Sequence, residues 1–347
     1  MIAPERVLNW LLEPENPPVR YLTLIHLLGK AETDSEVRST QARLMDYSVT
    51  QAILSHPEAL PLGDDRPYWK YDGLYWQLIL LGQFLADGQD PRVASAVRFV
   101  LEHCHWVQKR RWQCLTANLL AALMRLGYVD HPVVAEQTEA LARRIIEEGG
   151  IDCSEMGNSL LTRCFMALPK LLLCFAEVPP RQRSRTVAAA IERITSDLRD
   201  KDVYVYVPGR RKEWSKLLAD RPRSSDLPSG QRVKDWVARR RTEFLAAGGS
   251  GNPRPKRGWL QFGFPLHYNS DVLEAMTGLA RIGTPCDPRL DRALQAIRNK
   301  RTADGFWIID RSMNGRTLVD VEKTGAPSKW LTYRALFVLQ QFGTDDG

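Results

Sequence analysis

The chain alternates between two kinds of apolar pattern. Some stretches are apolar on nearly every face, and we expect these to be buried helices; they are residues 74–85, 115–126 and 272–282. Each is followed by a segment with one apolar stripe and charged residues on its other faces, which is typical of a helix on the outside of a protein; these are residues 92–101, 133–146 and 289–298. The alternation predicts helical hairpins with an inner and an outer member.

The junctions between these segments share one motif. An apolar stretch ends at a glycine, and an aspartate, usually with a nearby proline, begins the next segment; the pairs are Gly29/Asp34, Gly88/Asp90, Gly127/Asp130 and Gly283/Asp287. Glycine suits the left-handed end of a helix, and aspartate is a good N-cap. Recurrence of the motif indicates a repeated hairpin. We place the inner-helix starts near Arg20, Gly73, Leu115, Leu160, Ser270 and Trp330.

These hairpins predict an all-α fold that stacks as an open solenoid or closes into an (α/α) toroid with inner and outer layers. The interval from Leu160 to Ser270 is much longer than the others. The same region concentrates positive charge, with sixteen Lys or Arg and seven Asp or Glu between residues 199 and 257. Both signals predict a basic, Pro- and Gly-rich insertion at 200–262 within a single domain spanning 1–347. Inside it we expect a helix at 232–245 and a strand at 203–207.

Composition narrows the class of protein without changing this architecture. Apolar residues make up 44% of the chain and charged residues 26%, as in an ordinary globular protein. The sequence lacks an apolar run of the roughly 18 residues that a membrane helix needs. The first residues lack a signal-peptide pattern. We therefore expect a cytoplasmic protein whose six cysteines are thiols or metal ligands.

Two segments near the C-terminus carry a family resemblance. The run Arg-Thr-Ala-Asp-Gly-Phe-Trp at 301–307, followed by Ser-Lys-Trp-Leu-Thr-Tyr-Arg at 328–334, resembles repeat junctions of the α-toroid superfamily. That superfamily includes squalene and other terpene cyclases and the β subunits of protein prenyltransferases. The resemblance spans about residues 70–345. It implies a toroid with an apolar, aromatic-lined central cavity for an apolar ligand such as an isoprenoid.

The motifs that carry the chemistry of terpene cyclases differ in this chain. The Asp-x-Asp-Asp acid motif is missing, and Asp64-Asp65 only begins an Asp-Asp-x-x-Asp motif. We therefore expect neither standard route of terpene cyclisation.

The resemblance to prenyltransferases implies a zinc site at the N-terminal ends of the inner helices. In that family Asp, Cys and His side chains hold a catalytic zinc. The residues to consider at matching helix ends are Cys114, Cys153, Cys164 and His267, together with Asp271. The alternative is that the cysteines are small buried residues of helical cores.

Asp271 is the acid we single out as a catalytic candidate, with Tyr268 and Arg334 beside it in the predicted site. A carboxyl group in an apolar cavity has a raised pKa and can act as a general acid. The alternative is an N-cap for the helix that follows. Arg334 and Arg163 suit a diphosphate or carboxylate. We expect the cavity to be lined by Trp76, Asn118, Arg163, Trp259, Phe262, Trp307 and Trp330.

Three functions are compatible with these features. The first is an enzyme acting on an apolar ligand inside a toroid, and the second is a zinc-dependent enzyme on the same scaffold. The third is a non-catalytic helical-repeat protein whose basic insertion engages an acidic partner such as nucleic acid. We take the cavity-based enzyme as the working hypothesis.

Overall fold

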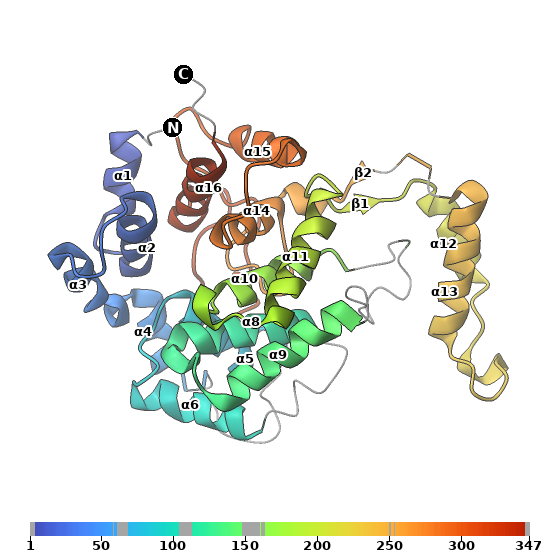
Figure 1. The fold of residues 1–347 in the computed structure, drawn as a ribbon, viewed down its shortest axis with the longest axis horizontal. Coiled ribbons are helices and arrows are strands. Elements are labelled where there is room, and N and C mark those ends of the chain that lie inside the picture. Colours follow the sequence, from blue (N-terminus) through green and yellow to red (C-terminus); the bar gives the residue numbers. More distant parts are fainter. Residues whose placement is uncertain are drawn as a thin grey trace.

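The fold is all-α, as the sequence predicts (Figure 1). The computed structural model describes residues 4–57, 59–60, 69–103, 113–147, 160, 164–249, 251–252 and 254–343. Within these residues one two-stranded ribbon is the only sheet. None of the described helices combines the length and apolar character that a bilayer span requires.

The inner helices pack side by side in chain order. Each contacts the next, and α16 also contacts the first hairpin. The row consists of α5 (Leu74–Gln83), α8 (Gln113–Leu123), α10 (Leu168–Ala176), α14 (Val272–Arg281), α16 (Lys329–Phe342) and then α2 (Pro17–Leu22) with the π-helical turn η1 (Thr23–Leu27). In α5 every residue from Leu74 to Gly82 is buried, and α14 is buried from Val272 to Ala280. Apolar residues on all faces therefore mark the inner layer, as expected.

Contacts between the neighbouring inner helices α10 and α14 show that these two helices run parallel. Between α10 and α14, Lys170 pairs with Glu274, and Glu177 just past α10 pairs with Arg281 at the end of α14; both pairs are 104 residues apart. A constant separation at two turns requires parallel helices in register, because antiparallel helices change their separation from turn to turn.

Each outer helix packs on the inner helix before it. The outer layer consists of α6 (Pro91–Glu102), α9 (Pro132–Glu147), α11 (Arg185–Arg199), α15 (Asp291–Arg298) and α3 (Ser35–Gln41). The predicted aspartate caps are confirmed at Asp34 and Asp90, whose side chains accept from the first-turn amides. Asp287 likewise caps η9 (Pro288–Leu290), directly before α15. At α9 the prediction is wrong, since His131 Nδ1 accepts from Val133 N there and Asp130 instead accepts from the Gln182 amide.

The glycine prediction holds at three junctions and fails at one. Gly29, Gly127 and Gly283 have positive φ, as a left-handed helix end requires, whereas Leu85 takes that conformation after α5. Gly88 instead lies where the backbone passes very close to the backbone of Leu126. A Cβ on it would lie 1.8 Å from the Leu126 carbonyl oxygen.

The third inner helix begins later than predicted. We expect a start near Leu160, and α10 begins at Leu168. Pro169 lies in the first turn of α10, where its missing N–H costs nothing and its fixed φ favours helix initiation. The residues just before α10 therefore belong to the connection.

Shorter elements complete the body. Near the N-terminus these are α1 (Glu5–Leu11), η2 (Leu44–Asp46) and α4 (Ser48–Ser55), and further along the chain η3 (Met124–Tyr128) and η5 (Pro180–Gln182). The 299–328 segment carries the Asp-Gly-Phe-Trp run. Gly305 has a φ of 90° there, and Trp307 is fully buried with its indole N–H donating to the Ile297 carbonyl over 2.8 Å.

The basic insertion forms a two-helix arm on a ribbon (Figure 1). Its elements are β1 (Tyr206–Val207), α12 (Arg211–Ala219), η6 (Ser224–Asp226), α13 (Val233–Phe244), η7 (Leu245–Gly249), β2 (Arg254–Pro255) and η8 (Arg257–Leu260). The expected helix at 232–245 is confirmed by α13. The expected strand at 203–207 is shorter, since β1 contains only Tyr206 and Val207, and the side chains of Val203 and Val205 are fully buried in the body's core.

Candidate functional site

A cavity of about 100 Å³ lies between the inner helices. Every inner helix contributes to it, and polar and charged side chains outnumber apolar ones. The resemblance implies an apolar cavity, and the structure differs because the inner helices carry charged residues on the sides that face one another. The lining residues are Leu22, His26, Gln83, Leu85, Asn118, Ala121, Arg125, Leu173, Glu177, Glu274, Thr277, Arg281, Trp330, Tyr333 and Arg334.

One carboxylate bridges two arginines at the C-terminal ends of the inner helices. Glu177 Oε1 accepts from Arg125 Nε at 2.7 Å, and its Oε2 accepts from Arg281 Nη2 at 3.0 Å. Burial alone would raise the pKa of Glu177, but Arg125 and Arg281 lower it to about 2. The bridge is therefore ionised at neutral pH, with one negative charge shared between two positive charges.

A second ion pair lies deeper, between α10 and α14. The Lys170 ammonium donates to Glu274, and the Lys170 side chain is only 2% exposed. Burial lowers the pKa of Lys170, and Glu274 opposes this shift. The carboxylate of Glu274 is thus engaged by Lys170, although it also lines the cavity.

Arg334 is the cation at this cavity whose charge is not matched by a direct partner. Within the described part of the chain it makes no ion pair and no hydrogen bond, and its guanidinium lies over the Phe264 ring at 4.8 Å. Burial lowers its pKa, and Glu274 and Asp271 oppose that shift without contacting it. An arginine is still protonated at neutral pH, so a positive charge faces the cavity.

His26 and Tyr333 form a neutral pair on the cavity wall. The Tyr333 hydroxyl and His26 Nδ1 are hydrogen-bonded, joining η1 to α16. Burial, reinforced by the charge of Arg281, lowers the pKa of His26 to about 4, and burial raises the pKa of Tyr333. Both groups are therefore uncharged at neutral pH.

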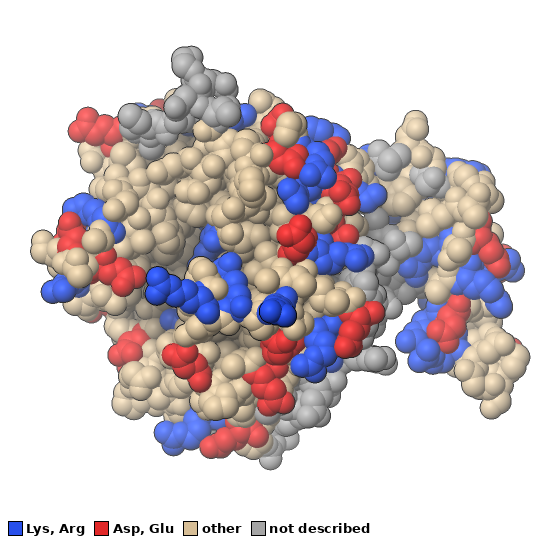
Figure 2. All heavy atoms as spheres, in the orientation of Figure 1, with Lys and Arg blue, Asp and Glu red and all other residues tan. Residues whose placement is uncertain are grey.

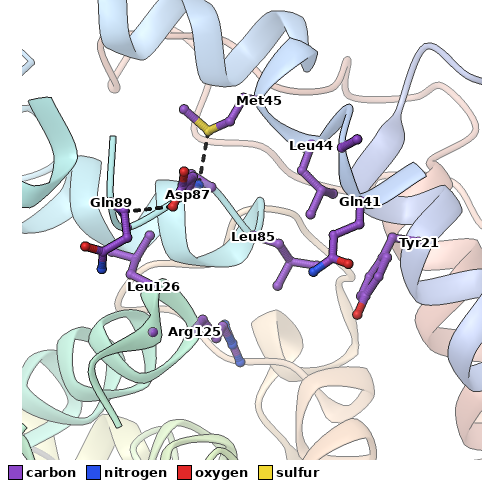
Figure 3. Close-up of a pocket in the computed structure, with 13 residues that line it drawn as sticks. Tyr21, Gln41, Leu44, Met45, Leu85, Asp87, Gln89, Arg125 and Leu126 are labelled. Atoms are coloured by element: carbon purple, nitrogen blue, oxygen red, sulfur yellow. Dashed lines mark hydrogen bonds between the residues drawn. The ribbon is translucent and has the colours of Figure 1, made fainter. Parts of the chain in front are cut away.

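An open groove adjoins the cavity between the first hairpin and the end of α5 (Figure 3). Its volume is about 550 Å³, and Leu85 and Arg125 line both the groove and the cavity. Figure 3 shows Leu85 between Arg125 and Met45, with Tyr21 and Gln41 on a third side. The groove and the charged cavity thus lie on either side of Leu85 and Arg125.

The structure places Asp271 as the N-cap of α14. Its Oδ1 accepts from Glu274 N at 2.8 Å and its Oδ2 from Gly263 N at 3.1 Å, with the side chain fully buried. Burial raises its pKa to about 6, helped by Glu274 and opposed by the two amides. Asp271 thus has both the raised pKa expected of a general acid and the hydrogen bonds expected of an N-cap. Neither it nor Tyr268 lines the cavity, whereas Arg334 does.

The predicted lining residues divide between cavity and core. Asn118 and Trp330 line the cavity. Trp76, Trp259, Phe262 and Trp307 are fully buried and lie outside the lining, and the Trp259 indole donates to the Val203 carbonyl over 2.7 Å. Large aromatic rings fill the core between inner helices, which is their ordinary use. Arg163 lies outside the described residues.

The zinc hypothesis stays a prediction. Cys114 and Cys164 are both partly buried, and Cys153 lies outside the described residues. The His267 imidazole is buried, packs against Tyr71 and Trp76, and has a pKa lowered to about 3 by burial, with a further contribution from Lys170. Among the described residues, no three His, Cys, Asp or Glu side chains come together as a metal-binding group.

The charged residues of the cavity were not among the predicted site residues, apart from Arg334. A signal for two of them is present in the repeat, because Arg125 and Arg281 both lie two positions before the junction glycine of an otherwise apolar helix. A charge at the same position of two buried repeat units indicates a shared inward-facing site. Lys170 and Glu274 lie in apolar runs too, and only their contact explains their burial.

No protein-family model, no curated protein and no solved structure matches the chain.

Proposed function

We propose that the inner and outer helices form an (α/α) toroid with the charged cavity at its centre. Three observations support this: the parallel course of α10 and α14, contacts between successive inner helices, and the return of α16 to the first hairpin. The groove beside Leu85 then lies between the first inner helix and α5, and gives access to the centre.

We further propose that this cavity binds the anionic group of a small molecule. The observation that carries the proposal is the position of Arg334, a cavity-lining cation with no ion pair among the described residues. Arg125 and Arg281 lie in the same lining and share a single carboxylate. A phosphate or carboxylate bound there would neutralise Arg334 through charge-assisted hydrogen bonds, which arginine forms well with both groups.

The size and polarity of the two spaces favour a ligand with an anionic head and a less polar remainder. The cavity of about 100 Å³ suits a compact anionic group, and the larger groove offers Leu44, Met45 and Leu85 to an apolar portion. An isoprenoid diphosphate, the ligand class implied by the resemblance, has this construction. His26 and Tyr333 would stand beside the anion as neutral hydrogen-bonding groups.

Calorimetric titration with pyrophosphate and with farnesyl diphosphate tests this proposal. We expect both to bind, and Arg334→Gln to weaken binding at least about tenfold, because one charge-assisted hydrogen bond contributes about 1.5–3 kcal/mol. Arg334→Lys keeps the charge and is expected to lose less. Arg316→Gln removes an exposed arginine far from the cavity lining and serves as the control.

Two results would contradict anion binding in the cavity. If neither anion binds the wild type, or if Arg334→Gln and Arg316→Gln bind them equally well, the cavity is not an anion site. Farnesol, which has the apolar chain without the diphosphate, should bind much more weakly than farnesyl diphosphate. Equal binding of the two would assign recognition to the groove instead.

A further inference from the structure

The arm, defined here as residues 211–244 with α12 and α13, packs its apolar side chains on one another and on Leu160, which lies outside the arm. Trp214 and Val237 are buried with Leu160 in a cluster separate from the main core, and the Trp214 and Phe244 rings are 5.6 Å apart. The ribbon of β1 and β2 connects the arm to the body, and both helices stand apart from it in Figure 1. Because this cluster covers the apolar face of the arm, the arm presents polar faces to solvent.

Those solvent faces carry an excess of positive charge. Five exposed cations of the arm make no ion pair within 4.0 Å and no hydrogen bond with any described residue; they are Arg211, Lys212, Lys216, Lys234 and Arg239. Figure 2 shows Lys and Arg side chains gathered over this region. Mutual repulsion makes such a cluster unfavourable unless an anionic partner binds it.

The acids of the arm do not cancel this charge, because most are already engaged. Asp235 pairs with Arg232 at 2.9 Å, and Glu243 pairs with Arg240 at 3.2 Å. Asp226 accepts from the backbone N–H of Arg223 and from the Ser225 hydroxyl. The five free cations are therefore left for an external anion, and they are spread over two helices rather than focused on one point.

We infer that the arm binds the phosphodiester backbone of a nucleic acid. Cations spread over a projecting two-helix element fit a ligand with regularly repeated charge, since each lysine or arginine neutralises one phosphate and releases a counterion. A membrane surface fits less well. A helix lying on a membrane needs an exposed apolar face, and in the described arm Leu217 is the one large apolar side chain that is well exposed.

The test is fluorescence anisotropy with a labelled duplex of about 20 base pairs, two helical turns. The main variant changes the five free cations to glutamine. We expect its affinity for the duplex to fall at least tenfold. Its dependence on salt should become shallower by about one unit of slope for each phosphate that the protein no longer neutralises.

A matched control lowers the net charge equally while leaving the arm intact. It changes five exposed body residues to glutamine: Arg38, Arg98, Arg143, Arg316 and Lys323. We expect this protein to bind the duplex like the wild type. A second variant joins Val207 to Arg254, which are paired in the ribbon, through Asn-Gly and so deletes the arm behind a two-residue hairpin turn. It is expected to lose binding as the five-site variant does.

Three results would overturn the inference. The wild type fails to bind the duplex, or the body control loses as much affinity as the arm variant, or phosphatidylserine vesicles bind through the arm while the duplex does not. Pyrophosphate binding at the central cavity is measured separately and should be the same in the wild type and in the arm variants. Failure of this inference is thereby distinguished from failure of the cavity proposal.

Discussion

At the residue scale, the cavity depends on how a few buried charges are compensated. Glu177 forms ion pairs with both Arg125 and Arg281, and Glu274 forms one with Lys170. Among the described residues, the Arg334 guanidinium has no ion pair and lies over an aromatic ring. Removing one partner from a buried pair leaves the other charge uncompensated, which costs more than the pair itself contributes. Substitutions of these acids should therefore change stability and anion binding in opposite directions.

Glu177→Gln is predicted to destabilise the protein and to tighten anion binding. Loss of the carboxylate leaves Arg125 and Arg281 without their shared partner, at a cost of about 3 kcal/mol in the free energy of unfolding. Phosphate in the buffer should restore part of this loss by occupying the same position. Urea denaturation with and without phosphate measures both effects.

The control for this variant is Glu243→Gln on the arm, which removes one member of an exposed pair with Arg240. Exposed pairs contribute little, so its stability should stay within about 1 kcal/mol of the wild type in either buffer. A Glu177→Gln protein as stable as this control would show that the bridge does not hold the two arginines.

The burial of His26 makes stability depend on pH. Its pKa is about 4 in the folded protein and about 6.5 in an unfolded chain, so the unfolded state takes up the proton first as the pH falls. The contribution of the neutral His26 side chain to the free energy of unfolding is complete above about pH 6.5. It is lost as the pH falls toward 4, by up to about 3 kcal/mol. His26→Gln should therefore lose less stability than the wild type between pH 7 and pH 4.5.

Asp271 changes the stability of the protein in the opposite direction over the same pH range. Its pKa is raised to about 6, so the stability it contributes is complete below its unfolded pKa and is lost as the pH rises through 6. The wild type and the His26→Gln protein both contain Asp271. The difference between their profiles of stability against pH therefore reports His26 alone. Parallel profiles for the wild type and His26→Gln would show that His26 titrates as in an unfolded chain.

At the element scale, the hairpins were largely predictable and the site was not. Apolar periodicity identified α5, α8 and α14, and the Gly and Asp junctions identified the turns, because both are local signals. The start of α10 was displaced by the turn chemistry of Pro169. The pairing of Lys170 with Glu274 joins residues 104 positions apart, and periodicity contains no information about such a contact.

Helix spacing gives a prediction at this scale. Gly82 in α5 faces α8 so closely that a Cβ on it would lie 2.6 Å from the Cα of Ala122. Alanine normally favours a helix over glycine by about 1 kcal/mol, but Gly82→Ala should destabilise the protein by about 1–3 kcal/mol because two backbones must separate. Thermal or chemical denaturation gives the difference.

Gly278→Ala is the matched comparison within α14. Its Cβ would meet the side chain of Leu172 at 3.1 Å, which can shift, whereas the backbone of α8 cannot. We expect Gly278→Ala to be clearly more stable than Gly82→Ala. The reverse order would mean that α5 and α8 are not packed at this distance.

At the scale of the whole molecule, the two proposed anion-binding sites lie in different parts of the fold, one in the central cavity and one on the arm. The interior cavity suits one small anion, and the exterior arm suits a long polyanion. The net charge of +7 comes from the basic insertion, since the rest of the chain is close to neutral.

The most direct test of the central proposal is to locate a bound oxyanion. Crystals grown with tungstate, a heavy analogue of phosphate, would reveal it by anomalous diffraction. We predict a peak in the central cavity about 4 Å from the nearest guanidinium nitrogen of Arg334, as expected when a tungstate oxygen accepts its hydrogen bond, and loss of the peak in Arg334→Gln. Peaks confined to the outer surface or to the arm, with an empty cavity at saturating tungstate, would contradict the assignment of this cavity as the ligand site.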